Sequence, residues 1–67
     1  MVRPGDRFVK CSDMTSVVWV VDGLIERPGC PLHVRLFKEQ SPVETITVAV
    51  AALGDPQYFR AACGDVP

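Results

Sequence analysis

The chain has 67 residues, 48% of them hydrophobic, and seven Lys and Arg against eight Asp and Glu give a net charge of −1. This length allows one domain over residues 1–67 and leaves no room for a cofactor-binding domain beside a catalytic one. The hydrophobic content excludes intrinsic disorder, and the lack of a basic run argues against nucleic-acid binding.

The N-terminal half predicts two strands around a bulge. Residues 7–11 follow the turn residues Pro4-Gly5-Asp6 and form a first strand with Phe8 toward the core. Residues 17–21 are five consecutive bulky apolar residues and form the central strand, although their pattern leaves open which face is buried. Asp22-Gly23 indicates a bulge or bend, and residues 26–31 form a loop because prolines and glycine interrupt ladder pairing.

The C-terminal half predicts two alternating strands, a helical turn and one ambiguous segment. Side chains on two predicted strands, residues 32–38 and 43–50, alternate between an inward and an outward face. The inward residues are Leu32, Val34, Leu36, Ile46, Val48 and Val50, and residues 39–42 form the turn between the strands. Residues 49–53 suit a short helical or 3-10 turn that ends at Gly54. Residues 56–62 fit either a short helix or a fifth strand that closes on the first, and we prefer the strand.

These elements predict a mainly β fold, a small SH3-like, partly open five-stranded barrel with one short helical or 3-10 turn. No apolar run approaches the roughly 18 residues that span a bilayer, and no signal peptide is recognisable at the N-terminus. The three cysteines form no CxxC pair, which is typical of a reducing compartment. We therefore expect a soluble, cytoplasmic protein without membrane association.

The surplus of apolar residues predicts a protein-binding surface. Once a barrel interior is filled, one half of the central strand, Phe37 and either Tyr58 or Phe59 remain outside, and polar neighbours form a rim around them. The candidate partner-binding residues are Trp19, His33, Arg35, Phe37, Thr45, Thr47 and Tyr58. The alternative is that the C-terminal segment covers this face within the monomer.

The sequence contains no recognisable catalytic motif. The one histidine has no nucleophile beside it in a motif, the acidic residues lie mostly in predicted loops, and there is no Gly-rich phosphate loop. Cys30 and His33 have zinc-ligand spacing, but a structural zinc site normally has two short spacers and only one is present. Cys11 and Cys63 become neighbours if the first and fifth strands pair. We expect no catalytic residue, no metal and no cofactor.

Three segments resemble the plasmid-borne type II dihydrofolate reductases: residues 5–10 (Gly-Asp-Arg-Phe-Val-Lys), the following Trp19, and residues 50–53 (Val-Ala-Ala-Leu). The resemblance implies an SH3-like barrel that works as a tetramer around a shared pore, where a lysine and a Gln-Ile-Tyr run bind folate and NADPH. Lys10 falls at the lysine position. Ile46-Thr47-Val48 stands at the Gln-Ile-Tyr position, and its Ile and Val lack the polar groups of those side chains.

Three hypotheses for function follow. The leading one is a non-enzymatic interaction module, a small bacterial or mobile-element accessory or inhibitor protein that binds a larger protein or associates with itself. The second is an oligomeric enzyme like the type II dihydrofolate reductases, on fold analogy. The third is an SH3-like nucleic-acid binder that uses Arg3, Arg7, Lys10, Arg35 and Arg60.

Overall fold

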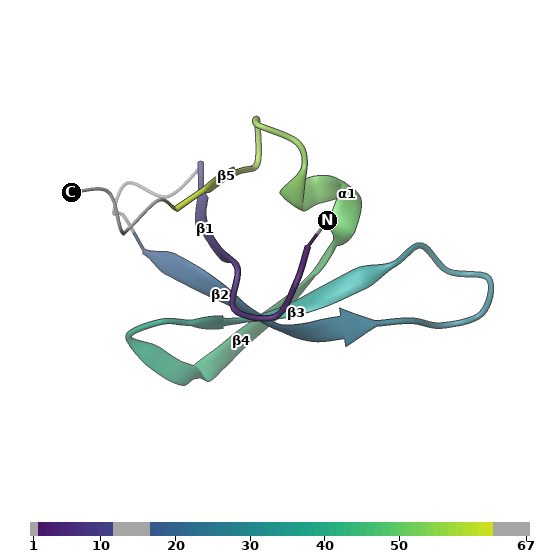
Figure 1. Cartoon of the computed structure of the whole chain (residues 1–67), viewed down its shortest axis with the longest axis horizontal. Coiled ribbons are helices and arrows are strands. Elements are labelled where there is room, and N and C mark those ends of the chain that lie inside the picture. Colours follow the sequence, from purple (N-terminus) through teal and green to yellow (C-terminus); the bar gives the residue numbers. More distant parts are fainter. Residues whose placement is uncertain (1, 12–16, 63–67) are drawn as a thin grey trace.

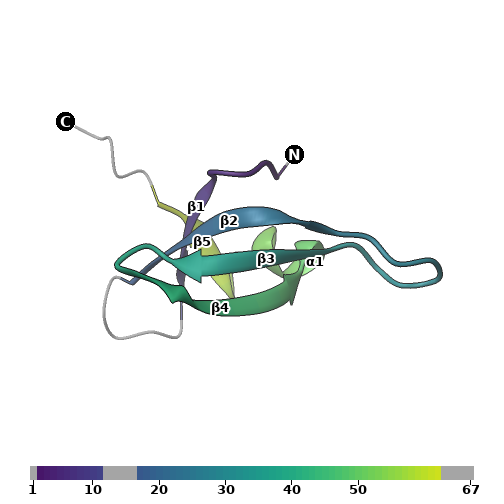
Figure 2. The same ribbon diagram turned by 90° about the horizontal axis from the view of Figure 1, so that it is seen from below.

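A computed structural model describes residues 2–11 and 17–62 of the chain. In chain order they form β1 (Arg7–Lys10), β2 (Val18–Ile25), β3 (His33–Lys38), β4 (Ser41–Ala49), α1 (Val50–Leu53) and β5 (Phe59–Ala61). The five strands make one antiparallel sheet in the order β4-β3-β2-β1-β5. The sheet curls, so that β1, β5 and α1 lie over one face of β2, β3 and β4 (Figure 1). Figure 2 shows the other face, with β2, β3 and β4 side by side. The predicted mainly β, partly open five-stranded fold is confirmed, and β2 is its central strand.

Strand β2 contains the predicted bulge. Val21 pairs with Leu36, but the next pair is Gly23 with Arg35, so that Asp22 is the extra residue. Side chains alternate between the two faces of a strand, and one inserted residue reverses the alternation that follows it. The bulge therefore places Leu24 on the face of the core and Ile25 on the opposite face.

The core lies between the β2–β3–β4 face and the elements above it. Its buried residues are Trp19, Val21, Val34, Leu36, Leu53 and Phe59, and Val2, Phe8, Val17, Ile46, Val48 and Val50 pack against them. The predicted inward placement of Phe8, Ile46 and Val48 is confirmed. Leu32 was expected inward as part of a strand, but it precedes β3 in the loop and is 37% exposed.

Trp19 belongs to this core. It lies opposite Phe8 on β1 and opposite Lys38 on β3, and only 6% of the residue is exposed. The Nζ atoms of Lys10 and Lys38 lie 5.5 and 5.8 Å from the centroid of its ring, a distance that allows cation–π attraction. The buried half of β2 is thus Trp19 with Val21, which corrects the expected outward placement of Trp19.

Strand β4 begins earlier than predicted and starts irregularly. Residues 39–42 were expected to form the turn, but the strand already includes Ser41, which pairs with Lys38. The next pair is Phe37 with Thr45, so that residues 42–44 have no partners on β3. Pro42 is tolerated there because an unpaired position needs no backbone N–H. Val43 is 90% exposed in this segment.

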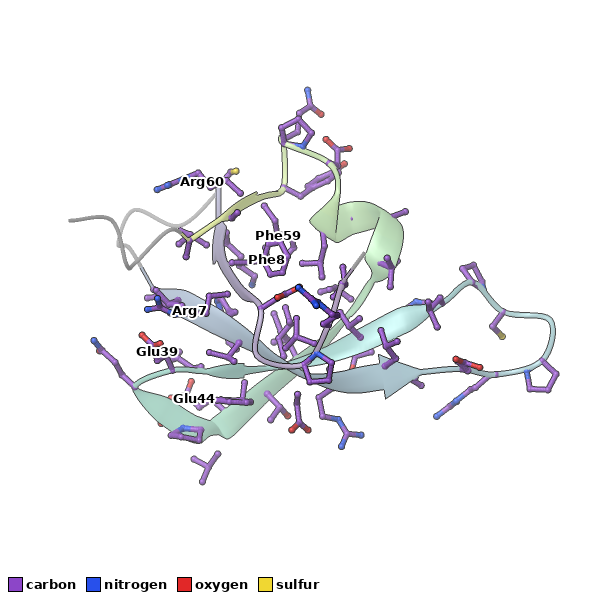
Figure 3. The ribbon with its side chains drawn as sticks, in the orientation of Figure 1. Arg7, Phe8, Glu39, Glu44, Phe59 and Arg60 are labelled. Carbon is purple, nitrogen blue, oxygen red and sulfur yellow. The ribbon has the colours of Figure 1, made fainter. Side chains whose placement is uncertain are left out.

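The segment from α1 to β5 follows the prediction. The helical turn α1 directs Leu53 into the core, and the backbone N–H of Gly54 donates to the carbonyl oxygen of Val50. Strand β5 then pairs with β1 and buries Phe59, which confirms the fifth strand over the alternative helix. Figure 3 shows Phe8 and Phe59 inside the curl of the sheet. Within residues 2–11 and 17–62, no helix has the length and apolarity to cross a membrane.

Candidate functional site

The face of β2, β3 and β4 that points away from the core carries most of the predicted surface residues. Val34 and Leu36 are fully buried on the core side of β3, so alternation places His33, Arg35 and Phe37 on the opposite side. Cross-strand pairing adds Thr47 opposite Arg35, and Thr45 opposite Phe37. We call this surface the outer face, defined by Val20, Ile25, His33, Arg35, Phe37, Thr45 and Thr47. It unites five of the seven predicted partner-binding residues.

The outer face is open to solvent among the described residues. Strands β1 and β5 and the turn α1 all lie on the other side of β2, β3 and β4 (Figures 1 and 2). Phe37 lies opposite Val20, and both are half-buried, while Arg35, Thr45 and Thr47 are exposed. The face therefore has an apolar centre with polar side chains beside it. The alternative that the C-terminal segment covers it concerns residues 63–67, which lie outside the described residues.

Two predicted residues do not belong to the outer face. Trp19 is in the core, as described above. Tyr58 is 57% exposed but precedes β5, and its carbonyl oxygen accepts a hydrogen bond of 2.8 Å from the backbone N–H of Cys11 at the end of β1. This places the backbone of Tyr58 at the β1–β5 pair, across the core from β3 and β4 (Figure 1).

A groove of about 290 Å³ lies where the β2–β3 hairpin extends beyond the sheet. Its lining residues are Ile25, Arg27, Cys30, Pro31, His33, Arg35 and Thr47. Nδ1 of His33 is 2.7 Å from the carbonyl oxygen of Pro31, which holds the imidazole against the loop. Gly23, opposite Arg35, has no side chain, and a Cβ added there would have no atom within 4 Å. The side of the groove next to Arg35 is therefore open.

Two other cations, Arg7 of β1 and Lys38 of β3, are held in ion pairs. Arg7 donates from Nε and Nη2 to the two carboxylate oxygens of Glu39, at 2.9 and 3.0 Å, and Figure 3 shows the two residues next to each other. Nζ of Lys38 donates to Glu44 at 2.9 Å. The hydrogen bonds from Lys38 and Ser41 lower the pKa of Glu44 below its usual value. Within the described part of the chain, neither Arg27 nor Arg35 makes an ion pair.

The described residues contain no cluster of three or more His, Cys, Asp or Glu side chains that could hold a metal. Cys30 and His33 both border the groove, whereas Cys11 lies at the end of β1, where its Sγ donates to the carbonyl oxygen of Pro56 at 3.2 Å. The expected neighbourhood of Cys11 and Cys63 falls outside the described residues.

The basic residues of the nucleic-acid hypothesis are spread over different elements. Arg7 is paired with Glu39, Lys10 lies over the Trp19 ring, and Arg35 is on the outer face. Arg60 is on β5 and points away from the curl of the sheet (Figure 3). Cross-strand pairing puts Arg7, opposite Val20, and Arg60, opposite Val9, on the same side of the sheet as Arg35, but Glu39 neutralises Arg7.

No family model, curated protein or solved structure matches this chain. The functional interpretation therefore depends on the chemistry of its own surface.

Sequence reasoning missed the part of the groove that comes from the hairpin. Its lining there is Ile25, Arg27, Cys30 and Pro31, whereas residues 26–31 were expected to form a loop in which only Cys30 was considered, as a zinc ligand. The signal was present in the bulge at Asp22. The reversed alternation carries Ile25 to the face of His33, at the point where the chain enters the loop that contains Arg27.

Proposed function

We propose that this protein is a non-enzymatic interaction module that binds another protein through its outer face. The observation that carries the proposal is the exposed sheet face with Phe37 and Val20 at its centre and Arg35, Thr45 and Thr47 beside them. Protein interfaces combine an apolar centre with a polar rim, and their binding energy is concentrated in a few aromatic and arginine side chains. Phe37 and Arg35 supply both kinds.

We further propose that the sheet is of the SH3-like class. Its support is the meander from β1 to β4, the helical turn before β5, and the pairing of β5 with β1. This class of fold hosts many functions, so the topology supports the architecture and the outer face supports the binding role.

The test compares two apolar-to-serine variants. Phe37→Ser removes the aromatic centre of the outer face, and Val43→Ser is the matched control because Val43 is 90% exposed in the irregular start of β4. Each variant is cross-linked in the source cell and its captured proteins are identified by mass spectrometry. Full burial of a Phe side chain contributes about 1.5–3 kcal/mol, and Phe37 is already half-buried, so Phe37→Ser is expected to weaken binding by roughly threefold to tenfold.

The expected result is one protein captured by the wild type and by Val43→Ser but lost from Phe37→Ser. Circular dichroism is used to check that both variants are folded. Capture of that protein by Phe37→Ser at wild-type yield would contradict the proposal. Sedimentation equilibrium distinguishes self-association, because a doubled mass that Phe37→Ser abolishes identifies the bound protein as a second copy.

A further inference from the structure

The groove at the base of the β2–β3 hairpin concentrates positive charge in a chain whose net charge is −1. Arg27 and Arg35 both line it, beside His33 and the hydroxyl-bearing Thr47. The two arginines are exposed, and within residues 2–11 and 17–62 neither has a carboxylate partner. Arg7 and Lys38, in contrast, are neutralised by glutamates of this chain.

The bulge in β2 is what brings these cations together. Ile25 lies opposite His33 on the outer face, and Arg27 follows Ile25 by two residues while Arg35 follows His33 by two residues. Arg35 shares the face of His33 within β3, and Arg27, in the loop that follows β2, lines the groove on the other side of the Ile25–His33 pair. Without Asp22 as the extra residue, Ile25 would have the opposite orientation.

The chemistry of the groove suits a carboxylate. A guanidinium presents parallel N–H donors that match the two oxygens of a carboxylate, and charge-assisted bonds of this kind are stronger than neutral ones. Thr47 adds a hydroxyl donor. Ile25 and Pro31 supply apolar walls for the methylene groups of an acidic side chain. The volume of about 290 Å³ is just below the range of small-molecule sites, which starts at about 300 Å³, and it suits one or two side chains.

We propose that this groove binds an aspartate or glutamate side chain of an acidic segment of the partner protein. The inference rests on the proposed function and names the chemistry of its partner. A protein segment is favoured over nucleic acid because the lining residues include no Phe, Tyr or Trp on which a base would stack, and because Arg7 and Lys38 are already neutralised.

The test uses the isolated protein, labelled with nitrogen-15, and a blocked peptide of sequence Gly-Glu-Gly-Glu-Gly. The control peptide has glutamine in place of glutamate, and ionic strength is held constant. We expect the acidic peptide, and not its control, to shift the amide resonances of His33, Arg35 and Thr47 in a saturable way. The double variant Arg27→Gln/Arg35→Gln should weaken this binding by roughly tenfold or more.

Arg60→Gln is the matched control variant, because Arg60 is an exposed arginine on β5, outside the groove. It should bind the acidic peptide as the wild type does. Equal shifts with the glutamine peptide, or unchanged affinity in the double variant, would overturn the proposal. Saturable binding of inorganic phosphate or of a short oligonucleotide at these residues, with no response to the acidic peptide, would also overturn it.

The titration contains no partner, so its failure and that of the proposed function are distinguishable. A groove that ignores the acidic peptide leaves the effect of Phe37→Ser on protein capture unchanged. Conversely, the groove could bind the peptide while Phe37→Ser captures the same proteins as the wild type. That result would support the carboxylate site and contradict the proposed interface on the outer face.

Discussion

Replacing Leu36 with alanine should remove a large share of the stability of this domain. Leu36 is fully buried in β3, with Val21 opposite it on β2 and Ile46 opposite it on β4. Truncation of a fully buried leucine to alanine costs about 2.7–5 kcal/mol of unfolding free energy, and this range includes the cost of the cavity that remains. Folded domains have about 0.05–0.15 kcal/mol of stability per residue, which for this length gives roughly 3–10 kcal/mol in total. Leu36→Ala therefore removes from about a quarter of this stability to all of it.

The assay is urea denaturation followed by circular dichroism, with Leu24→Ala as the control. Leu24 is also a leucine on the core side of the sheet, but it is 42% exposed, so its truncation should cost about 1 kcal/mol. The free energy of unfolding should thus fall several times more in Leu36→Ala. In thermal melts each kcal/mol should lower Tm by about 4–8 °C. Equal losses in the two variants would refute the division between buried centre and exposed hairpin.

Two further predictions concern the ion pairs. In a double-mutant cycle, Arg7→Ala and Glu39→Ala should show a coupling energy of about 0.2–1 kcal/mol, because the pair is bidentate but each side chain is about one-third or more exposed. If the two losses of unfolding free energy, measured in urea, simply add, the pairing is refuted. Glu44→Gln tests a lowered pKa: the carboxylate stabilises the fold above its unfolded-state pKa, and this contribution is lost as the pH falls through the lowered folded-state pKa. The loss of stability in Glu44→Gln relative to the wild type should therefore be present at pH 7 and vanish in acid, and a loss that persists in acid would point to a cause other than the Lys38 ion pair.

The arrangement of the strands could be predicted from the sequence where turn chemistry and alternation agree. The bulge at Asp22-Gly23, the end of α1 at Gly54 and the extended β5 all came from such local signals. The buried face of β2 could not be predicted, because both of its faces are apolar. Pairing with β1 decides it, since Phe8 on the core side lies opposite Trp19.

The candidate site could likewise be predicted from the sequence only in part. Alternation along β3 predicted that His33, Arg35 and Phe37 share a face, and the structure has them there. The groove depends on a one-residue insertion in β2, which matters only after the strands are in register. Local pattern therefore predicted the face, and tertiary pairing formed the groove within it.

Pairing of β1 with β5 has a consequence for synthesis on the ribosome. Phe8 lies opposite Ala61, so this ladder joins the first strand to one that leaves the exit tunnel more than fifty residues later. Contacts between such distant positions carry a large entropic cost of loop closure and slow the overall reaction. The hairpins from β2 to β4 can form before β5 is made, but Trp19 and Leu36 stay partly open to water until Phe59 of β5 packs against the core. A newly made chain is therefore most susceptible to proteolysis and aggregation in the interval before β5 docks.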